Sequence, residues 1–130
     1  MSIVRKVMVV DDARVVRMAL RGIMKKMGWE VVEAADGREA VSQLEKNPDL
    51  SLILLDWHMP EMNGYDFLVY LRSKPEFSEN PKVVMVTTEA SMPSMLQALA
   101  AGADEYIMKP FDADMIASKL EQVGIVVEAS

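Results

Sequence analysis

The chain of 130 residues contains no cysteine, a single histidine, and only six glycines and six prolines. Without cysteine it can have no disulfide framework, no thiolate nucleophile and no cysteine-ligated zinc or iron–sulfur site. Apolar residues make up 51% of the chain, which together with the low Gly and Pro content excludes collagenous, low-complexity and disordered proteins. The length predicts one domain over residues 1–130, with a core from about residue 5 to 124 and a short tail at 125–130.

Long hydrophobic runs are also missing. The first apolar run, Val7–Val10, has four residues before Asp11, too few for the core of a signal peptide. No later run approaches the roughly 20 residues of a membrane span. The sequence therefore predicts a soluble cytoplasmic protein.

The formal net charge is −6, which disfavours binding to nucleic acid or to an anionic membrane, since both attract clustered cations. The charge is unevenly distributed, however, because residues 1–26 hold seven of the fourteen Lys and Arg and only two acids. We therefore expect one local basic surface on an acidic molecule.

Short Val/Ile/Leu-rich runs alternate with longer amphipathic segments, which is typical of repeated βα units. The predicted strands are Lys6–Val10, Glu30–Ala34, Ser51–Leu55, Val83–Val86 and Glu105–Met108. The predicted helices are Ala13–Met27, Arg38–Lys46, Tyr65–Ser73, Pro93–Ala101 and Ala113–Val123. Gly28, Gly102 and Gly124 supply helix stops, and Asp112 is the expected N-cap of the last helix.

Three of the predicted strands are continuously apolar, the pattern of strands covered on both faces in a parallel sheet. Right-handed crossovers with one reversal of winding direction give a doubly wound α/β fold. Its ligand site lies beyond the carboxyl ends of the strands, so any chemistry is expected just after Val10, Leu55, Val86 and Met108.

Polar residues occupy all four of these positions: Asp11 and Asp12, Asp56, Thr87 and Thr88, and Lys109 followed by Pro110. Three converging carboxylates need a counter-cation, and oxygen ligands without His or Cys favour Mg²⁺. A hydroxyl and an ammonium across the same crevice suit a phosphoryl group, and Asp56 can be a carboxylate nucleophile that forms an acyl phosphate.

Each residue alone has an ordinary explanation. Asp11 or Asp12 could be the N-cap of the first helix, Asp56 a loop carboxylate, Thr87 a β-branched strand residue and Lys109 a solvated cation. Their joint occurrence, each at the end of its own strand, favours the functional interpretation.

Four segments resemble the receiver domain of two-component response regulators, most closely its stand-alone chemotaxis (CheY-like) type. They are Val9–Asp12, Leu55–Gly64, Val86–Thr88 and Tyr106–Phe111, and the resemblance covers residues 5–124. It implies a single flavodoxin-like domain with five helices and a parallel sheet of order 2-1-3-4-5.

The resemblance implies a role for each matching residue. Asp56 is the phospho-acceptor, and Mg²⁺ is held by Asp11, Asp12, Asp56 and the backbone carbonyl of His58. Thr87 is the switch hydroxyl, Lys109 the phosphate-binding cation and Tyr106 the aromatic rotamer switch. The Lys109–Pro110 bond is cis in this family.

His58 and Glu89 lie two residues after Asp56 and Thr87, where the family tunes the lifetime of the acyl phosphate. Glu89 could also pair with Lys109 when no phosphate is bound. His58 could be a second phospho-acceptor or metal ligand, but a loop residue that flanks the site is the simpler interpretation.

The output surface that the resemblance implies is the fourth helix, fifth strand and fifth helix. Its expected exposed residues are Met92, Met95, Tyr106, Lys119 and Gln122. Methionine adapts to irregular partners, although Met at helical spacing is also ordinary core filling.

On the first helix, four cations fall within one stripe at about 100° per residue: Arg14, Arg17, Arg21 and Lys25. Met18 lies in this stripe, with Val15 beside it. The stripe can be a docking face for a histidine kinase or phosphotransfer protein, or simply a solvated helix face.

The sequence thus predicts a monomeric signalling module with only self-phosphorylation and self-dephosphorylation chemistry, whose partner is a protein such as the flagellar motor switch. A phosphate sink or a phosphorelay intermediate is the alternative on the same fold. A nucleotide-binding enzyme is disfavoured because no glycine-rich loop follows the first strand. A transcription factor is disfavoured by the length and by the acidic charge.

Overall fold

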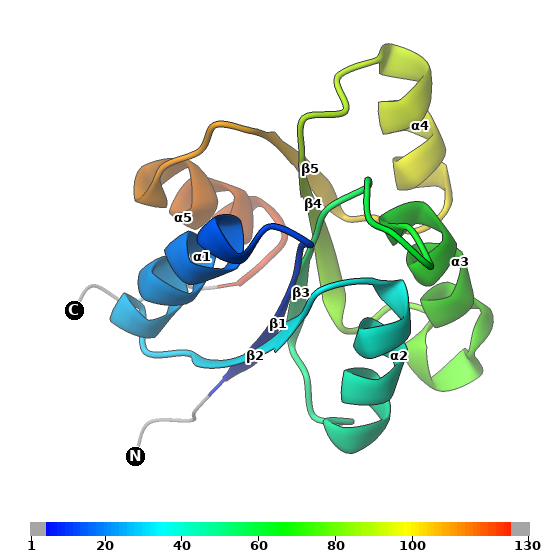
Figure 1. The fold of residues 1–130 in the computed structure, drawn as a ribbon, viewed down its shortest axis with the longest axis horizontal. Coiled ribbons are helices and arrows are strands. Elements are labelled where there is room, and N and C mark those ends of the chain that lie inside the picture. Colours follow the sequence, from blue (N-terminus) through cyan, green and yellow to red (C-terminus); the bar gives the residue numbers. More distant parts are fainter. Residues whose placement is uncertain (1–4, 126–130) are drawn as a thin grey trace.

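In the computed structural model, which describes residues 5–125, five parallel strands form one sheet of order β2-β1-β3-β4-β5 with helices on both faces (Figure 1). The strands are β1 (Lys6–Val10), β2 (Glu30–Ala34), β3 (Leu52–Leu55), β4 (Lys82–Thr87) and β5 (Glu105–Met108). The helices are α1 (Arg14–Lys26), α2 (Gly37–Lys46), α3 (Gly64–Ser73), α4 (Met92–Ala100) and α5 (Ala113–Gln122). The predicted fold class and strand order are confirmed.

Each of these elements differs from its predicted range by no more than one residue at either end. A short 3₁₀ helix, η1 (Pro75–Phe77), was not predicted. Gly28, Gly102 and Gly124 have positive φ where their helices end, and the Asp112 side chain accepts a hydrogen bond from Met115 N as the N-cap of α5. The tail at 126–130 lies outside the described residues.

The sheet separates two apolar layers because alternate residues of each strand point to opposite faces. On the side of α2, α3 and α4, Met8 and Val10 pack with Phe67. On the side of α1 and α5, Val7 and Val9 pack with a second set of helix residues, among them Leu20, Met24, Ile116 and Leu120 (Figure 1). The continuously apolar strands are therefore buried on both faces, as their sequence predicted.

The parallel register brings the carboxyl ends of the strands to one edge of the sheet. Val10 pairs with Leu55 and with Ala34, so the residues that follow β1 and β3 emerge side by side. Thr87 pairs with Met108 at the carboxyl ends of β4 and β5, so the residues that follow these two strands emerge at the same edge. Within residues 5–125, no helix is both long enough and apolar enough to cross a membrane.

Candidate functional site

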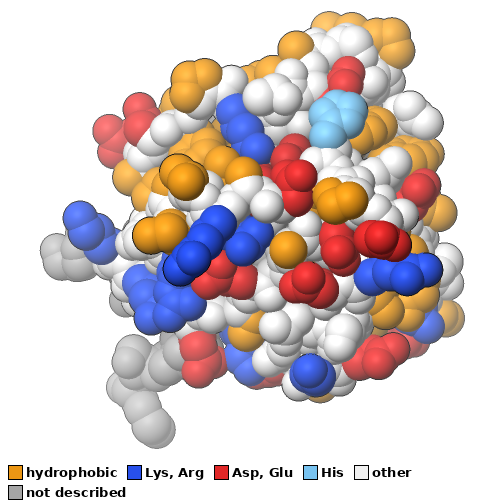
Figure 2. All heavy atoms as spheres, in the orientation of Figure 1, with side chains coloured by type: hydrophobic (Ala, Val, Ile, Leu, Met, Phe, Trp, Pro, Cys, Tyr) orange, Lys and Arg blue, Asp and Glu red, His pale blue; other side chains and the backbone are white. Residues whose placement is uncertain are grey.

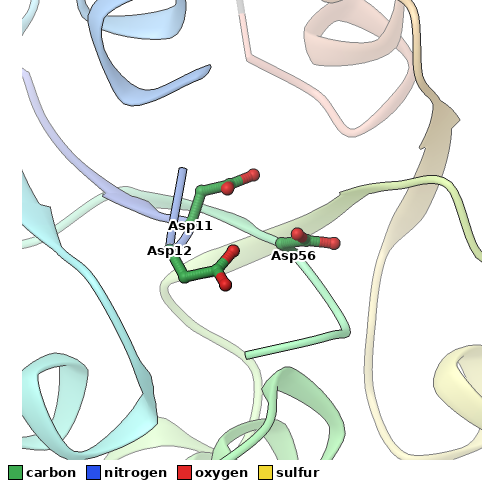
Figure 3. A group of neighbouring side chains, drawn as sticks. All are labelled: Asp11, Asp12 and Asp56. Atoms are coloured by element: carbon green, nitrogen blue, oxygen red, sulfur yellow. The ribbon is translucent and has the colours of Figure 1, made fainter. Parts of the chain in front are cut away.

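Three carboxylates meet at the carboxyl edge of the sheet (Figure 3). The ligand oxygens of Asp11, Asp12 and Asp56 all lie within 4.8 Å of one another. Asp11 and Asp56 are buried, with 1% and 6% of their surface exposed, whereas Asp12 is exposed. The cluster comes from two adjacent strands, because Asp11 and Asp12 follow β1 and Asp56 follows β3.

Lys109 bridges the two buried acids. Its Nζ lies 2.7 Å from Asp11 Oδ2 and 3.1 Å from Asp56 Oδ2. Burial lowers the pKa of Lys109, but the hydrogen bonds and negative charges of Asp11 and Asp56 outweigh it and leave the pKa above its usual value. The lysine is therefore a fixed cation beside Asp56.

Burial is also the main influence on Asp11, and it raises the pKa of this carboxyl above its usual value. The hydrogen bonds from Lys109 and from Ala13 N oppose the shift, and the charge of Asp56 adds to it. Two buried carboxylates share one lysine here, so a further cation would be stabilised at this edge.

The second oxygen of the Asp56 carboxylate, which Lys109 does not contact, is held by the backbone. Asp56 Oδ1 accepts a hydrogen bond of 2.7 Å from Trp57 N. Gly64 N donates to Trp57 O at 2.8 Å, and a Cβ at Gly64 would lie 1.8 Å from Asp56 O. Only glycine lets the start of α3 approach Asp56 this closely, a requirement that sequence reasoning missed.

Neither Asp11 nor Asp12 is the N-cap of α1, so that alternative is wrong. The N-cap is Ala13, which has no side chain able to cap. Asp11 Oδ1 instead accepts from Ala13 N at 2.9 Å, and Arg17 donates to Asp11 O at 2.7 Å. The first contact holds the Asp11 side chain, and the second holds its backbone carbonyl.

Thr87 and Tyr106 both contact the backbone of Glu89. The buried Thr87 Oγ1 accepts from Glu89 N at 3.1 Å, and Tyr106 donates from its hydroxyl to Glu89 O at 2.7 Å. The expectation of an exposed Tyr106 is wrong for this structure, because its side chain is 5% exposed and packs in the core. Burial, with smaller contributions from Glu89 and Asp56, raises the pKa of Tyr106 to about 12.

Glu89 pairs with His58 and not with Lys109 as the sequence suggested. His58 Nε2 lies 2.8 Å from Glu89 Oε1, and Glu89 Oε2 also accepts from Ser91 Oγ. The hydrogen bond with His58, followed by those with Ser91 and Ser94, lowers the pKa of Glu89. Lys109 is already engaged by Asp11 and Asp56, which leaves Glu89 to the His58 side chain at the surface (Figure 2).

The other predicted contact residues differ in exposure. Met92 is 63% exposed, whereas Met95 is half-buried against the core and Lys119 is half-buried in an ion pair with Glu105. On α1, Met18 is 59% exposed. Arg17 is mostly buried, so its expected role at a partner surface is not supported by its exposure.

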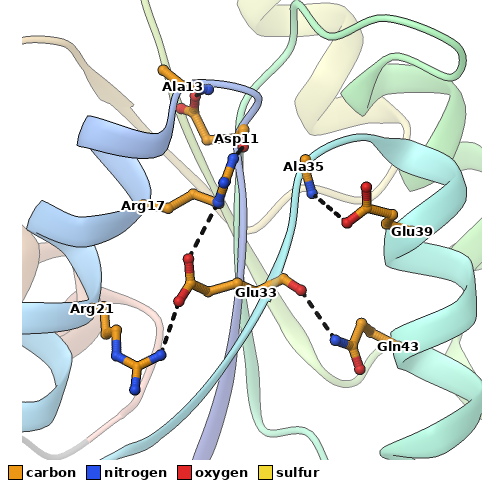
Figure 4. Close-up of polar contacts among 8 residues, drawn as sticks. All are labelled: Asp11, Ala13, Arg17, Arg21, Glu33, Ala35, Glu39 and Gln43. Atoms are coloured by element: carbon orange, nitrogen blue, oxygen red, sulfur yellow. Dashed lines mark hydrogen bonds and ion pairs between the residues drawn. The ribbon is translucent and has the colours of Figure 1, made fainter.

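Arg17 and Arg21 reach from α1 to the same carboxylate, Glu33 of β2 (Figure 4). Arg17 Nε lies 3.2 Å from Glu33 Oε1, and Arg21 Nη1 lies 2.9 Å from Glu33 Oε2. Two of the four cations of the predicted basic stripe thus share one carboxylate of the sheet, which the helical periodicity of α1 alone could not reveal.

The chain belongs to the response regulator receiver domain family, whose model matches residues 7–121. It is similar to chemotaxis protein CheY1 of Helicobacter pylori, at 40% identity over 91% of this chain and 95% of the relative. It is also similar to the CheY homolog of Campylobacter jejuni, at 38% identity over 91% of each chain. The chain is thus a CheY-type signalling module and not a catalytic enzyme.

Solved structures of chemotaxis CheY proteins have the same fold. Chemotaxis protein CheY4 of Vibrio cholerae superposes with a TM-score of 0.86 at 31% identity, covering 93% of this chain and 99% of that one. CheY in the CheX–CheY–BeF3–Mg²⁺ complex of Borrelia burgdorferi has a TM-score of 0.86 at 27% identity, covering 94% of this chain and 90% of that one. The acidic triad described above is typical of the Mg²⁺ site of receivers.

Proposed function

We propose that this chain accepts a phosphoryl group on Asp56 from the phosphohistidine of a histidine kinase or phosphotransfer protein, and that it then changes its affinity for a protein partner. The observation that carries the proposal is the contact of one ammonium group, Lys109, with both Asp11 and Asp56. The chemotaxis relatives favour a cytoplasmic partner such as the flagellar motor switch. A phosphate sink or phosphorelay intermediate would use the same site without a partner that distinguishes the two forms.

The donor set fits Mg²⁺, because it consists of carboxylate oxygens from one exposed and two buried acids with no nitrogen or sulfur. Asp11, Asp12 and Asp56 would hold the ion together with the His58 backbone carbonyl. When bound, Mg²⁺ would neutralise the carboxylates and the incoming phosphoryl oxygens.

Phosphoryl transfer then follows from the residues of the chain. An Asp56 oxygen forms the new bond to phosphorus while the bond from phosphorus to the donor imidazole nitrogen breaks, and its electron pair stays on that nitrogen. Lys109 can move its ammonium group from the Asp56 carboxylate to a phosphoryl oxygen, because the negative charge of the carboxylate is replaced by that of the phosphoryl group bound to it. Thr87 can donate its hydroxyl to a second phosphoryl oxygen, since it only accepts a hydrogen bond from Glu89 N at present.

Output would begin at Glu89. A Thr87 side chain that turns toward the phosphoryl group releases Glu89 N, while Tyr106 already holds Glu89 O from inside the core. The loop between β4 and α4 would therefore shift between two packed arrangements, with Tyr106 favouring one of them. The contact between His58 and Glu89 links the segments that follow β3 and β4, and it would tune how readily water reaches the acyl phosphate.

The output surface in this proposal centres on α4. Residues Met92–Ala100 include no charged side chain, and three large apolar residues are exposed there: Met92, Leu96 and Leu99, at 63%, 59% and 41%. Such a surface suits an apolar segment of a protein partner. On the opposite side of the sheet, α1 would receive the phosphodonor beside the Asp56 mouth.

The test is incubation with acetyl phosphate and Mg²⁺, followed by intact mass measurement. The wild-type chain should gain one phosphoryl group, and Asp56→Asn should gain none. Asp66→Asn is the matched control, because it removes an exposed carboxylate nearby on α3 and should label like the wild type. An undiminished gain in Asp56→Asn, or no gain in the wild type, would overturn the assignment.

A further inference from the structure

Asn63 and Gly64 form the only Asn-Gly pair of the chain. The two other asparagines, Asn47 and Asn80, each precede a proline, which has no backbone N–H. A side-chain amide that is attacked by the backbone nitrogen of the next residue loses ammonia, and glycine favours this attack because it leaves the backbone free to adopt the required conformation. Asn63 is therefore the one asparagine of this chain whose sequence favours deamidation by its own backbone.

The reaction has two steps, and water is its only co-reactant. Gly64 N gives its proton to a solvent base and bonds to Cγ of Asn63, while the bond from Cγ to Nδ2 breaks and ammonia leaves with a proton from solvent. Water then opens the cyclic imide. Attack at Cγ yields aspartate, whereas attack at the main-chain carbonyl of residue 63 yields isoaspartate, in which the chain runs through Cγ to Gly64.

The turn at the start of α3 keeps the two reacting groups apart. Gly64 is buried and its N–H donates to Trp57 O at 2.8 Å, so the proton is shielded from a solvent base. The Asn63 side chain caps α3 by accepting from Asp66 N at 2.8 Å. The ψ angle of Asn63 is 170°, which leaves Gly64 N and the Asn63 Cβ staggered about the Cα–C bond, whereas the imide needs them eclipsed. The turn must therefore open before the reaction can begin.

The same turn supports the Asp56 carboxylate. Asp56 Oδ1 accepts from Trp57 N, and Trp57 O is held in turn by Gly64 N. The contact has no spare room, because a Cβ on Gly64 would already lie 1.8 Å from Asp56 O. Isoaspartate at position 63 lengthens the main chain by one carbon atom directly before Gly64. The added atom moves Gly64 against Asp56 or away from Trp57, and either movement displaces the carboxylate.

We infer that Asn63 is a site of spontaneous deamidation, that the folded turn suppresses the reaction, and that isoaspartate at this position silences the Asp56 site. The last part rests on the proposed function, whereas the first two parts do not. The modification needs no enzyme and no partner, so its rate depends on how often the turn opens.

The first experiment compares the folded chain with the unfolded chain. Wild-type protein is kept at mildly alkaline pH in buffer and in guanidinium chloride, and peptide mass spectrometry follows the mass gained when an amide becomes a carboxyl. In denaturant the gain should appear in the peptide that contains Asn63 and not in those that contain Asn47 or Asn80. In buffer the reaction should be slower by about tenfold or more, because opening the turn breaks two hydrogen bonds. Equal rates in both solutions, or an earlier gain at Asn47 or Asn80, would overturn the inference.

The second experiment tests the product. Wild type and Asn63→Ser are aged in guanidinium chloride, refolded, and labelled with acetyl phosphate and Mg²⁺; serine keeps a capping hydroxyl but cannot deamidate. On a phosphate-affinity gel, isoaspartate in the labelled wild-type band should be about a tenth or less of its share in the unlabelled band, because a small displacement of a reacting group slows transfer that much. Asn63→Ser should label as it did before ageing. Fresh Asn63→Asp, which adds the charge without lengthening the main chain, should label like fresh wild type.

Three results would contradict the silencing of Asp56: an equal share of isoaspartate in both bands, an equal loss of labelling in aged Asn63→Ser, and a loss of labelling in fresh Asn63→Asp. The last of these would assign the effect to charge and not to the longer main chain. Failure of fresh wild type to label would instead count against the proposed function, and the first experiment would still test the suppression of deamidation by the turn.

Discussion

Replacing Asp12 by asparagine should stabilise the metal-free protein and, at the same time, weaken its stabilisation by Mg²⁺. Asp12 has no ion pair among residues 5–125, and its carboxylate lies within 4.8 Å of the ligand oxygens of Asp11 and Asp56. The substitution therefore removes repulsion without removing a salt bridge. It also removes one oxygen anion from the proposed metal site.

The magnitude follows from the geometry. Two unit charges 4.8 Å apart repel by about 0.9 kcal/mol in water, and Asp12 is exposed enough for this solvent value to apply. Two such repulsions, partly offset by the attraction of Lys109, give a net gain of about 1 kcal/mol. For a chain of 130 residues this raises the melting temperature by roughly 4 °C.

Mg²⁺ should stabilise the wild type more than it stabilises Asp12→Asn. At ten times its dissociation constant, an ion that binds only the folded state stabilises it by about 1.4 kcal/mol, or roughly 5 °C here. Asp12→Asn should show a much smaller shift at the same Mg²⁺ concentration. Asp12→Asn should therefore be more stable than the wild type without Mg²⁺, and its stability should rise less when Mg²⁺ is added.

The assay is thermal unfolding by circular dichroism with and without MgCl2, at constant ionic strength so that general screening does not differ. Asp66→Asn, with the same charge change on α3, should keep the full Mg²⁺ shift. The reasoning is refuted if Asp12→Asn is less stable than wild type without metal and retains the full shift with it.

Two further predictions concern the surroundings of Asp56 and of Tyr106. Gly64→Ala should reduce the free energy of unfolding by more than about 3 kcal/mol in urea titration and abolish acetyl phosphate labelling, because the new Cβ would overlap Asp56 O. Retention of wild-type stability and labelling would contradict the tight contact. Tyr106, whose pKa is raised from 10.0 to about 12, should make the folded protein lose stability as the pH rises from 10 to 12, since the unfolded chain releases this proton first. Tyr106→Phe should lack this part of the pH dependence, measured by chemical denaturation across that range, and an identical slope in both proteins would exclude Tyr106 as its source.

Local sequence patterns determined most of the fold. The three central strands carry continuous apolar runs that are buried on both faces, and each helix ends close to a glycine, a proline or a polar cap. These signals act within a few residues, so they survive without knowledge of the rest of the chain. The acids after Val10 and Leu55 could be placed together for the same reason, because parallel strands end at one edge of the sheet.

The tertiary structure decided which side chains find each other. Lys109 contacts both Asp11 and Asp56, which leaves Glu89 to His58, and Glu33 pairs with both Arg17 and Arg21, of which only Arg17 is mostly buried. Tyr106 turns into the core because its hydroxyl reaches Glu89 O there. Such pairings depend on competition among groups far apart in the sequence. Only the packed chain sets the distances between these groups, and therefore which of them form an ion pair or a hydrogen bond.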